Sequence, residues 1–128
     1  MNRYPYSTEY VPAAPVVQIH LGAPGESTIL GPLEAFVDTG ADATLIPVEY
    51  LRQVEARKVD WAVLRSQWGE RRPVPLYAVA MQINHHYFAA IWVVGDEYSE
   101  EVVLGRNVLN QIRLLLDGPA MTLELLEG

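Results

Sequence analysis

Residues 36–42 read Phe36-Val37-Asp38-Thr39-Gly40-Ala41-Asp42, and this stretch decides the fold that we expect. An apolar strand ends there in an Asp-Thr-Gly turn, which occurs once in the chain. A carboxylate in such a turn either activates water or hydrogen-bonds its own backbone, which is the common role of a turn aspartate. Because the tripeptide arises by chance in roughly a few per cent of chains of this length, the residues around it must decide its meaning.

Short strand-like segments follow one another along the chain, and turn residues separate them. Segments of this kind indicate an all-β barrel or sandwich. A short helix is expected over Pro47–Ala56, where proline suits the first helical position, and a helical turn or two over Gly105–Gln111. The expected strands span residues 16–21, 33–37, 44–46, 61–64, 74–77, 79–83, 88–94, 102–104, 112–116 and 121–126.

The segment before Val16 shows no periodicity, so we expect residues 1–15 to form a weakly ordered arm and residues 16–128 to form one domain. A chain of 128 residues suffices for a single hydrophobic core. It contains no cysteine, which excludes disulfides and thiol catalysis.

The net charge of -7 disfavours nucleic acid as a partner. No apolar run approaches the ~20 residues that a membrane-spanning helix needs, and the N-terminal residues lack the apolar core of a signal peptide. We therefore expect a cytoplasmic protein that binds neither membrane nor nucleic acid. His85 and His86 are adjacent and would point to opposite faces of a strand, so no metal site or cofactor is expected.

A second apolar segment lies about 65 residues after Asp38, and it reads Val103-Leu104-Gly105-Arg106-Asn107-Val108-Leu109. Together with the Asp-Thr-Gly turn, it resembles the retropepsins, the single-domain aspartic proteases of retroviruses and their cellular and bacterial relatives. The resemblance covers roughly residues 16–126. It implies a closed all-β barrel with one or two short helices that is active as a two-fold homodimer.

The resemblance also implies roles for the residues of the turn. Asp38 is similar to the catalytic aspartate of the family, and Thr39 to the residue whose hydroxyl locks two turns together across a dimer axis. Gly40 would let a substrate backbone approach closely. Ala41 and Asp42 would bind substrate.

Other expected site residues lie outside the turn. Arg106 would support Asp42 through a guanidinium fork that lysine cannot copy. Val103 falls where the family lines its side-chain pockets. The family also needs a flap, and the candidate is the hairpin around Gln67-Trp68-Gly69-Glu70, with Trp68 and Gly69 against substrate. This tip differs from the glycine-rich viral pattern in its bulky tryptophan and in three nearby arginines, at positions 65, 71 and 72.

Two carboxyl groups must meet in this chemistry, because they share one proton and can then act as acid and base together. The chain has no second Asp-Thr-Gly or Asp-Ser-Gly. We therefore predict a homodimer that contributes Asp38 from each subunit and hydrolyses peptide bonds in peptide or protein substrates. Two alternatives remain open: a catalytically weak or inactive dimerisation or peptide-binding module of the same fold, and a plain β-barrel in which Asp38 is only a turn residue.

Two further features carry hypotheses. The acidic run Asp96–Glu101 precedes Val103, and we hypothesise that it favours basic substrate residues. The terminal strands at 112–116 and 121–126 are too apolar for an exposed edge, so we expect them to be buried in the core, in a dimer interface, or in both.

Overall fold

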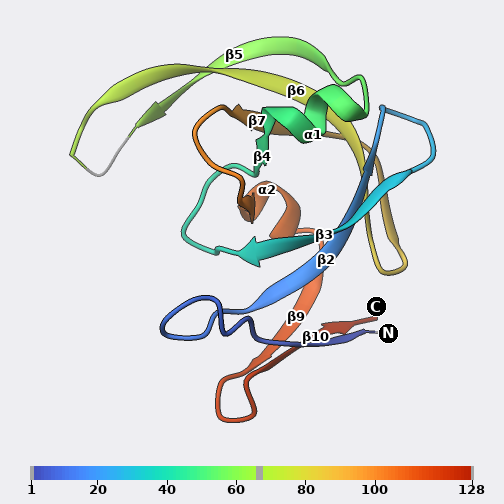
Figure 1. Cartoon of the computed structure of the whole chain (residues 1–128), viewed down its shortest axis with the longest axis vertical. Coiled ribbons are helices and arrows are strands. Elements are labelled where there is room, and N and C mark those ends of the chain that lie inside the picture. The colour runs from blue at the N-terminus through green and yellow to red at the C-terminus, as the bar shows by residue number, and fades with distance from the viewer. Residues whose placement is uncertain (1, 66–67, 128) are drawn as a thin grey trace.

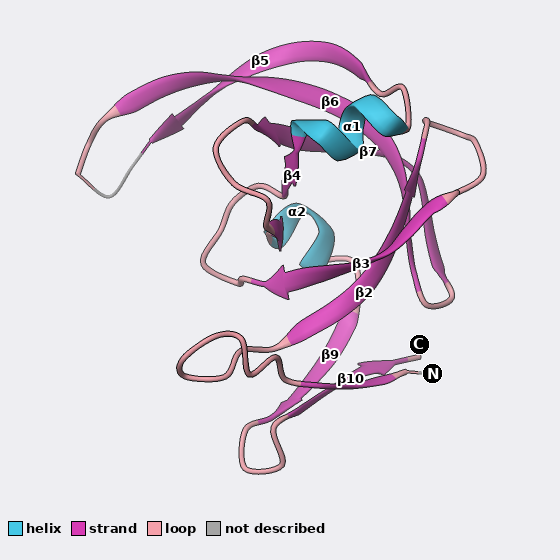
Figure 2. Cartoon of the chain, in the orientation of Figure 1, coloured by secondary structure: helices cyan, strands magenta, loops and turns pink. Residues whose placement is uncertain are grey.

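The structure is a computed structural model that describes residues 2–65 and 68–127. Strands dominate it, with two short helices (Figures 1 and 2). Neither helix in this part of the chain has the length and apolarity needed to cross a membrane. The elements are β1 (Arg3–Pro5), β2 (Val16–Gly22), β3 (Leu30–Val37), β4 (Leu45–Pro47), α1 (Val48–Gln53), β5 (Arg57–Arg65), β6 (Arg71–Ile83), β7 (His86–Asp96), β8 (Val102–Leu104), α2 (Arg106–Leu109), β9 (Arg113–Asp117) and β10 (Thr122–Leu126).

Six strands close into a barrel in the order β2-β3-β8-β4-β7-β6, because the end of β6 pairs back onto β2. Gly22 lies opposite Ala80 at this closure, and His20 lies opposite Gln82. The closed all-β barrel expected from the sequence is thereby confirmed. Its interior is filled by fully buried apolar side chains from almost every strand, among them Ile19, Leu21, Ile46, Met81, Ile83, Val93 and Leu104.

β5 and the first part of β6 extend away from the barrel as a two-stranded arm (Figure 1). We define the arm as residues 57–78 as far as the structure describes them. The sequence predicts separate strands at 74–77 and 79–83, and this is wrong: β6 is one strand of 13 residues. It pairs with β7 on one side, while β5 and then β2 share its other edge. The two expected hairpins therefore share their middle strand.

Residues 3–5 correct the expectation of a weakly ordered N-terminal arm. They form β1, which pairs with β10 and places Arg3 opposite Glu124 in an ion pair of 2.9 Å. A bridge between Ser7 and Ala14 orders the segment further. A strand of three residues that contains Pro5 has no readable alternation, and its partner lies at the other end of the chain. The start of the domain at Val16 stays a prediction.

Both helices are shorter than predicted. Pro47 caps α1 instead of entering it, and the helix ends before Val54. α2 spans four residues. This brevity suits a barrel in which each helix only connects two strands.

The two chain ends meet in a separate sheet of order β1-β10-β9 (Figure 1). Leu123 and Leu125 of β10 are buried in the core, as their alternation with Glu124 indicates. β9 forms the outer edge, where Leu115 and Leu116 are 50% and 47% exposed. This chain alone therefore leaves an apolar edge strand uncovered.

Candidate active site

Three strands hold the Asp-Thr-Gly turn. β8 lies between β3, which runs parallel to it, and β4, which is antiparallel to it at Leu45. Residues 38–44 connect β3 to β4 across the end of β8. The backbone N–H of Asp38 donates to the carbonyl of Leu104 at 3.1 Å, which fixes the start of the turn on β8.

The Asp38 carboxylate takes part in the turn itself. Oδ1 of Asp38 accepts a hydrogen bond from the N–H of Gly40 at 2.9 Å. The backbone carbonyl of Asp38 accepts another from the N–H of Ala41 at 3.2 Å. Among the described residues, its Oδ2 has no hydrogen-bond partner, and the side chain is half-buried. The turn role and a chemical role are therefore compatible, because one oxygen orients the group and the other stays available.

Gly105 lets the second motif pack directly against this turn. A Cβ at this position would lie 2.3 Å from the carbonyl oxygen of Ala43, so no side chain fits. The N–H of Gly105 donates to the fully buried hydroxyl of Thr44 at 3.0 Å, and that hydroxyl donates to Asn107 Oδ1 at 2.8 Å. Asn107 in turn donates to the carbonyl of Trp92 at 2.8 Å. This network joins the turn, α2 and β7.

Arg106 of α2 contacts the turn through both its backbone and its side chain. Its backbone N–H donates to the carbonyl of Ala41 at 2.8 Å, and its Nη1 donates to the carbonyl of Thr39 at 3.0 Å. Its Nη2 forms an ion pair with Asp42. Arg106 and Asp42 thus lie in contact, as the resemblance implies, and their roles toward substrate stay predictions. The Asp42 side chain remains 86% exposed, so it can also contact a ligand.

A groove of about 500 Å³ lies between the turn and the arm. Gly40, Ala41 and Asp42 line this cavity together, and their contacts with substrate stay predictions. The sequence did not point to the remaining lining residues, because only the pairing of β5 with β6 brings the arm over the turn. These further residues are Ala43, Leu45, Val63, Leu64 and Arg65.

The other predicted site residues lie outside this groove. Trp68 is 82% exposed at the tip of the arm, and Gly69 adopts a φ of 85°, which favours glycine. Gln67, the first residue of the predicted flap tip, lies outside the described residues. Val103 is half-buried and lies opposite Phe36 and Leu45, which flank the turn. Substrate contacts of Trp68, Gly69 and Val103 stay predictions.

Part of the negative charge in the acidic run Asp96–Glu101 is engaged in hydrogen bonds within the run itself. The Asp96 carboxylate accepts hydrogen bonds from the N–H groups of Tyr98 and Ser99 at 2.8 and 3.2 Å. Burial, a hydrogen bond with Glu101 and nearby carboxylates raise the pKa of Tyr10 to about 12. Arg72 lies over the Tyr98 ring at 5.1 Å, so this loop also supports the arm. The hypothesis of a basic substrate preference therefore rests on fewer free carboxylates than the sequence indicates.

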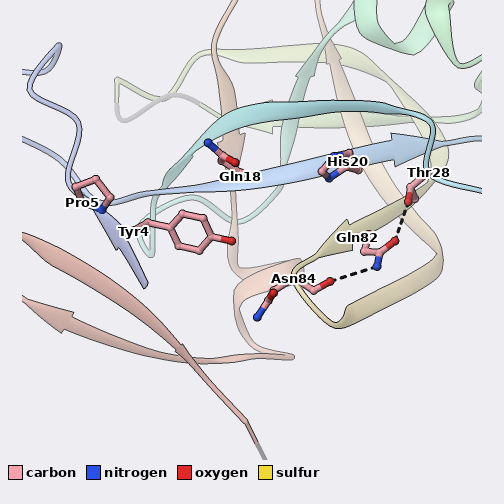
Figure 3. A pocket seen from close by; sticks show the side chains of 7 residues that line it. All are labelled: Tyr4, Pro5, Gln18, His20, Thr28, Gln82 and Asn84. Carbon is pink, nitrogen blue, oxygen red and sulfur yellow. Dashed lines mark hydrogen bonds between the residues drawn. The ribbon is translucent and has the colours of Figure 1, made fainter. Parts of the chain in front are cut away.

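A second, polar cavity of about 500 Å³ shares no residue with the groove (Figure 3). The hydroxyl of Thr28 donates to Gln82 Oε1 at 2.9 Å, and Gln82 Nε2 donates to the carbonyl of Asn84 at 3.2 Å. Tyr4, Pro5, Gln18 and His20 complete the lining. No pattern in the sequence indicates this cavity, because its lining comes from segments far apart in the chain: β2 pairs with β6, and β1 is held nearby by its pairing with β10.

Three features characterise this site: the Asp38 turn, the contacts that Arg106 makes with the turn, and the groove beside it. The family model described as retroviral aspartyl protease matches residues 12–117. The chain belongs to this family. The match includes both motifs and the whole arm, so the retropepsin resemblance is confirmed. Comparison with curated proteins gives no match.

Solved structures of retropepsin-like proteases share the fold. EIAV protease complexed with the inhibitor HBY-793 aligns with a TM-score of 0.62 at 17% identity, over 84% of this chain and 93% of that chain. A retropepsin-like aspartic protease from Rickettsia conorii aligns with a TM-score of 0.65 at 13% identity, over 96% and 87%. The retroviral protease-like domain of Ddi1 from Leishmania major gives 0.52 at 13% identity, over 89% and 94%. Aspartic proteolysis is thus the chemistry of the family to which this chain belongs.

Proposed function

We propose that this protein is an aspartic endopeptidase in which two Asp38 carboxyl groups, one from each subunit of a homodimer, activate water. The observation that carries the proposal is the Asp38 turn, which Gly105 and Arg106 hold on β8 and whose residues 40–43 line an open groove. The available Oδ2 of Asp38 would face its own copy across the two-fold axis.

The chemistry requires one ionised and one protonated carboxyl group. The ionised group takes a proton from water, and the water oxygen forms a bond to the scissile carbonyl carbon, while the protonated group gives its proton to the carbonyl oxygen. The carboxyl group that took the proton from water then gives it to the amide nitrogen. As the C–N bond breaks and the amine leaves, one hydroxyl of the tetrahedral intermediate gives its proton to the other carboxylate and becomes the carbonyl of the new acid. The pair thereby returns to its starting protonation, and no cofactor takes part in the cycle.

The proposed roles of the turn residues follow from their positions. The exposed Thr39 side chain would hydrogen-bond across the dimer axis, and Gly40 would leave room for the substrate backbone. Ala41 and Asp42 line the groove and would bind that backbone, with Arg106 holding Asp42 in place. The arm would act as the flap, excluding water when substrate is bound.

The terminal sheet supports dimerisation. β9 is an outer strand that pairs with β10 on one side only and exposes Leu115 and Leu116, and an exposed apolar edge strand promotes pairing with another chain. Pairing of the two terminal sheets would bury these leucines and would bring the two turns together on one axis. The domain's net charge of -7 opposes this approach, and salt would screen that repulsion.

The purified protein is expected to cleave an unfolded protein substrate at moderately acidic pH, and a statine-type transition-state inhibitor should block the cleavage. The readout is the appearance of new peptide ends by mass spectrometry, with and without inhibitor. A dimer that neither cleaves substrate nor binds the inhibitor would contradict the proposal and would favour a peptide-binding module instead.

A further inference from the structure

The arm concentrates the positive charge of an otherwise acidic chain. Nine basic residues face sixteen acidic ones in the whole sequence, yet residues 57–72 contain five basic residues and only two acidic ones, Asp60 and Glu70. The arm is therefore a basic projection on a negatively charged protein. Its basic residues are Arg57, Lys58, Arg65, Arg71 and Arg72.

Two of these arginines repel each other directly. Arg65 of β5 lies opposite Arg71 of β6 in the antiparallel register. Side chains in such positions have Cβ atoms roughly 4.5–5.5 Å apart, and like charges there are destabilising. Among the described residues, no carboxylate forms an ion pair with either arginine. Arg72 differs, because its guanidinium lies over the ring of Tyr98.

One of these two uncompensated charges, that of Arg65, lies at the candidate substrate groove, while Arg71 lies opposite Arg65 on β6. Arg65 lines that groove together with Gly40–Ala43. The one carboxylate among the lining residues belongs to Asp42, and Arg106 already neutralises it. A ligand that enters the groove therefore meets an excess of positive charge on the side of the arm.

We propose that Arg65 and Arg71 bind an acidic side chain of an extended substrate and so determine its specificity. The inference rests on the proposed peptidase function and adds the substrate class. A carboxylate between two guanidinium groups can accept paired hydrogen bonds from each, and it replaces their repulsion with attraction. Because Arg65 lines the groove with Gly40–Ala43, and Asp38 is not among the lining residues, we place the acidic residue beside the scissile position, not at it. Two-fold symmetry offers the same clamp on both sides.

Matched peptide pairs test the proposal. Glutamate is placed at each position flanking the scissile bond in turn, and each peptide is compared with its glutamine counterpart. At one position or more, kcat/KM for the glutamate peptide should exceed that for the glutamine peptide by about tenfold at low salt, and high salt should reduce the ratio. The double variant Arg65→Gln, Arg71→Gln should bring the ratio to about one, and the double variant Arg65→Glu, Arg71→Glu should prefer a lysine peptide.

The double variant Arg57→Gln, Lys58→Gln is the matched control, because it also removes two positive charges, here from the base of the arm, opposite Ala78 and Tyr77 and outside the groove. It should keep both the activity and the ratio. A wild-type ratio near one, a ratio that survives in the double variant, or a general preference for basic residues would overturn the proposal.

Binding separates this inference from the peptidase proposal. The affinity of Asp38→Asn for the uncleaved glutamate and glutamine peptides is measured by fluorescence anisotropy, which needs no turnover. Tighter binding of the glutamate peptide, lost when Arg65 and Arg71 are also replaced, supports the clamp even if the wild-type protein hydrolyses nothing. Equal binding of the two peptides contradicts it even if hydrolysis is normal.

Discussion

Asp38→Asn should lower the rate of peptide hydrolysis by roughly 10³-fold or more and leave the fold intact, because a general acid and base is removed from both halves of the site. The amide oxygen of asparagine can still accept the hydrogen bond from the N–H of Gly40, so the turn keeps its geometry. The amide cannot take a proton from water. The loss should therefore appear in kcat, with thermal stability and dimer mass unchanged.

Asp117→Asn is a close control for this result. The Asp117 carboxylate likewise accepts a hydrogen bond within its own turn, from the N–H of Ala120 at 3.1 Å, but it lies at the end of β9 and not at the groove. This variant should keep full activity. Normal turnover by Asp38→Asn would contradict the assignment of the catalytic group, as would an equal loss in both variants.

The native site should also show a bell-shaped activity profile on the acidic side of neutrality. The pair works only with one carboxyl ionised and the other protonated, so activity falls when both are protonated and when both are ionised.

Gly105→Ala should be the most damaging substitution for stability. The added methyl group would meet backbone atoms of Ala43 at 2.3 Å, and backbone cannot rotate away as a flexible side chain can. Either the turn or α2 must move, which strains the Gly105–Thr44 hydrogen bond and the grip of Arg106. We expect a loss of about 3 kcal/mol, the upper end for overpacking, and a fall in Tm of roughly 10 °C.

Gly118→Ala is the control for chain entropy and composition. No atom lies within 4 Å of a Cβ at this position, and its φ is not in the left-handed region. The Tm of Gly118→Ala should stay within about 2 °C of wild type. The two proteins are compared at the same concentration, because the stability of a dimer depends on protein concentration. Similar melting temperatures for the two alanine variants would contradict the tight packing of the two motifs.

The sequence predicted those parts of the fold that depend on local pattern. The strands before and after Asp38 were found because apolar residues end abruptly in turn residues there. The continuity of β6 through Ala78 was missed, because the sequence was interpreted as two successive hairpins and no local pattern shows that they share one strand. Pairing with two different partners along one edge keeps that strand continuous.

Those residues of the candidate site that lie in the two sequence motifs could be predicted. Asp38, Asp42 and Arg106 could be named in advance, because the resemblance places them in two specific segments. Arg65 could not be assigned to the groove, since its position there depends on how the arm curves over the turn. The buried hydroxyl of Thr44 was missed for the same reason: its partners Gly105 and Asn107 lie more than 60 residues away and meet it only in the fold.

The central claim is that one active site needs an Asp38 from each of two subunits, and subunit mixing tests it most directly. Wild-type and Asp38→Asn chains are refolded together at known ratios, and specific activity is measured above the concentration at which the dimer forms. If both aspartates are required, an equal mixture keeps about one quarter of the wild-type activity, because only wild-type pairs work. An activity of about one half, which falls in proportion to the wild-type fraction, would show that one chain suffices and would contradict the account.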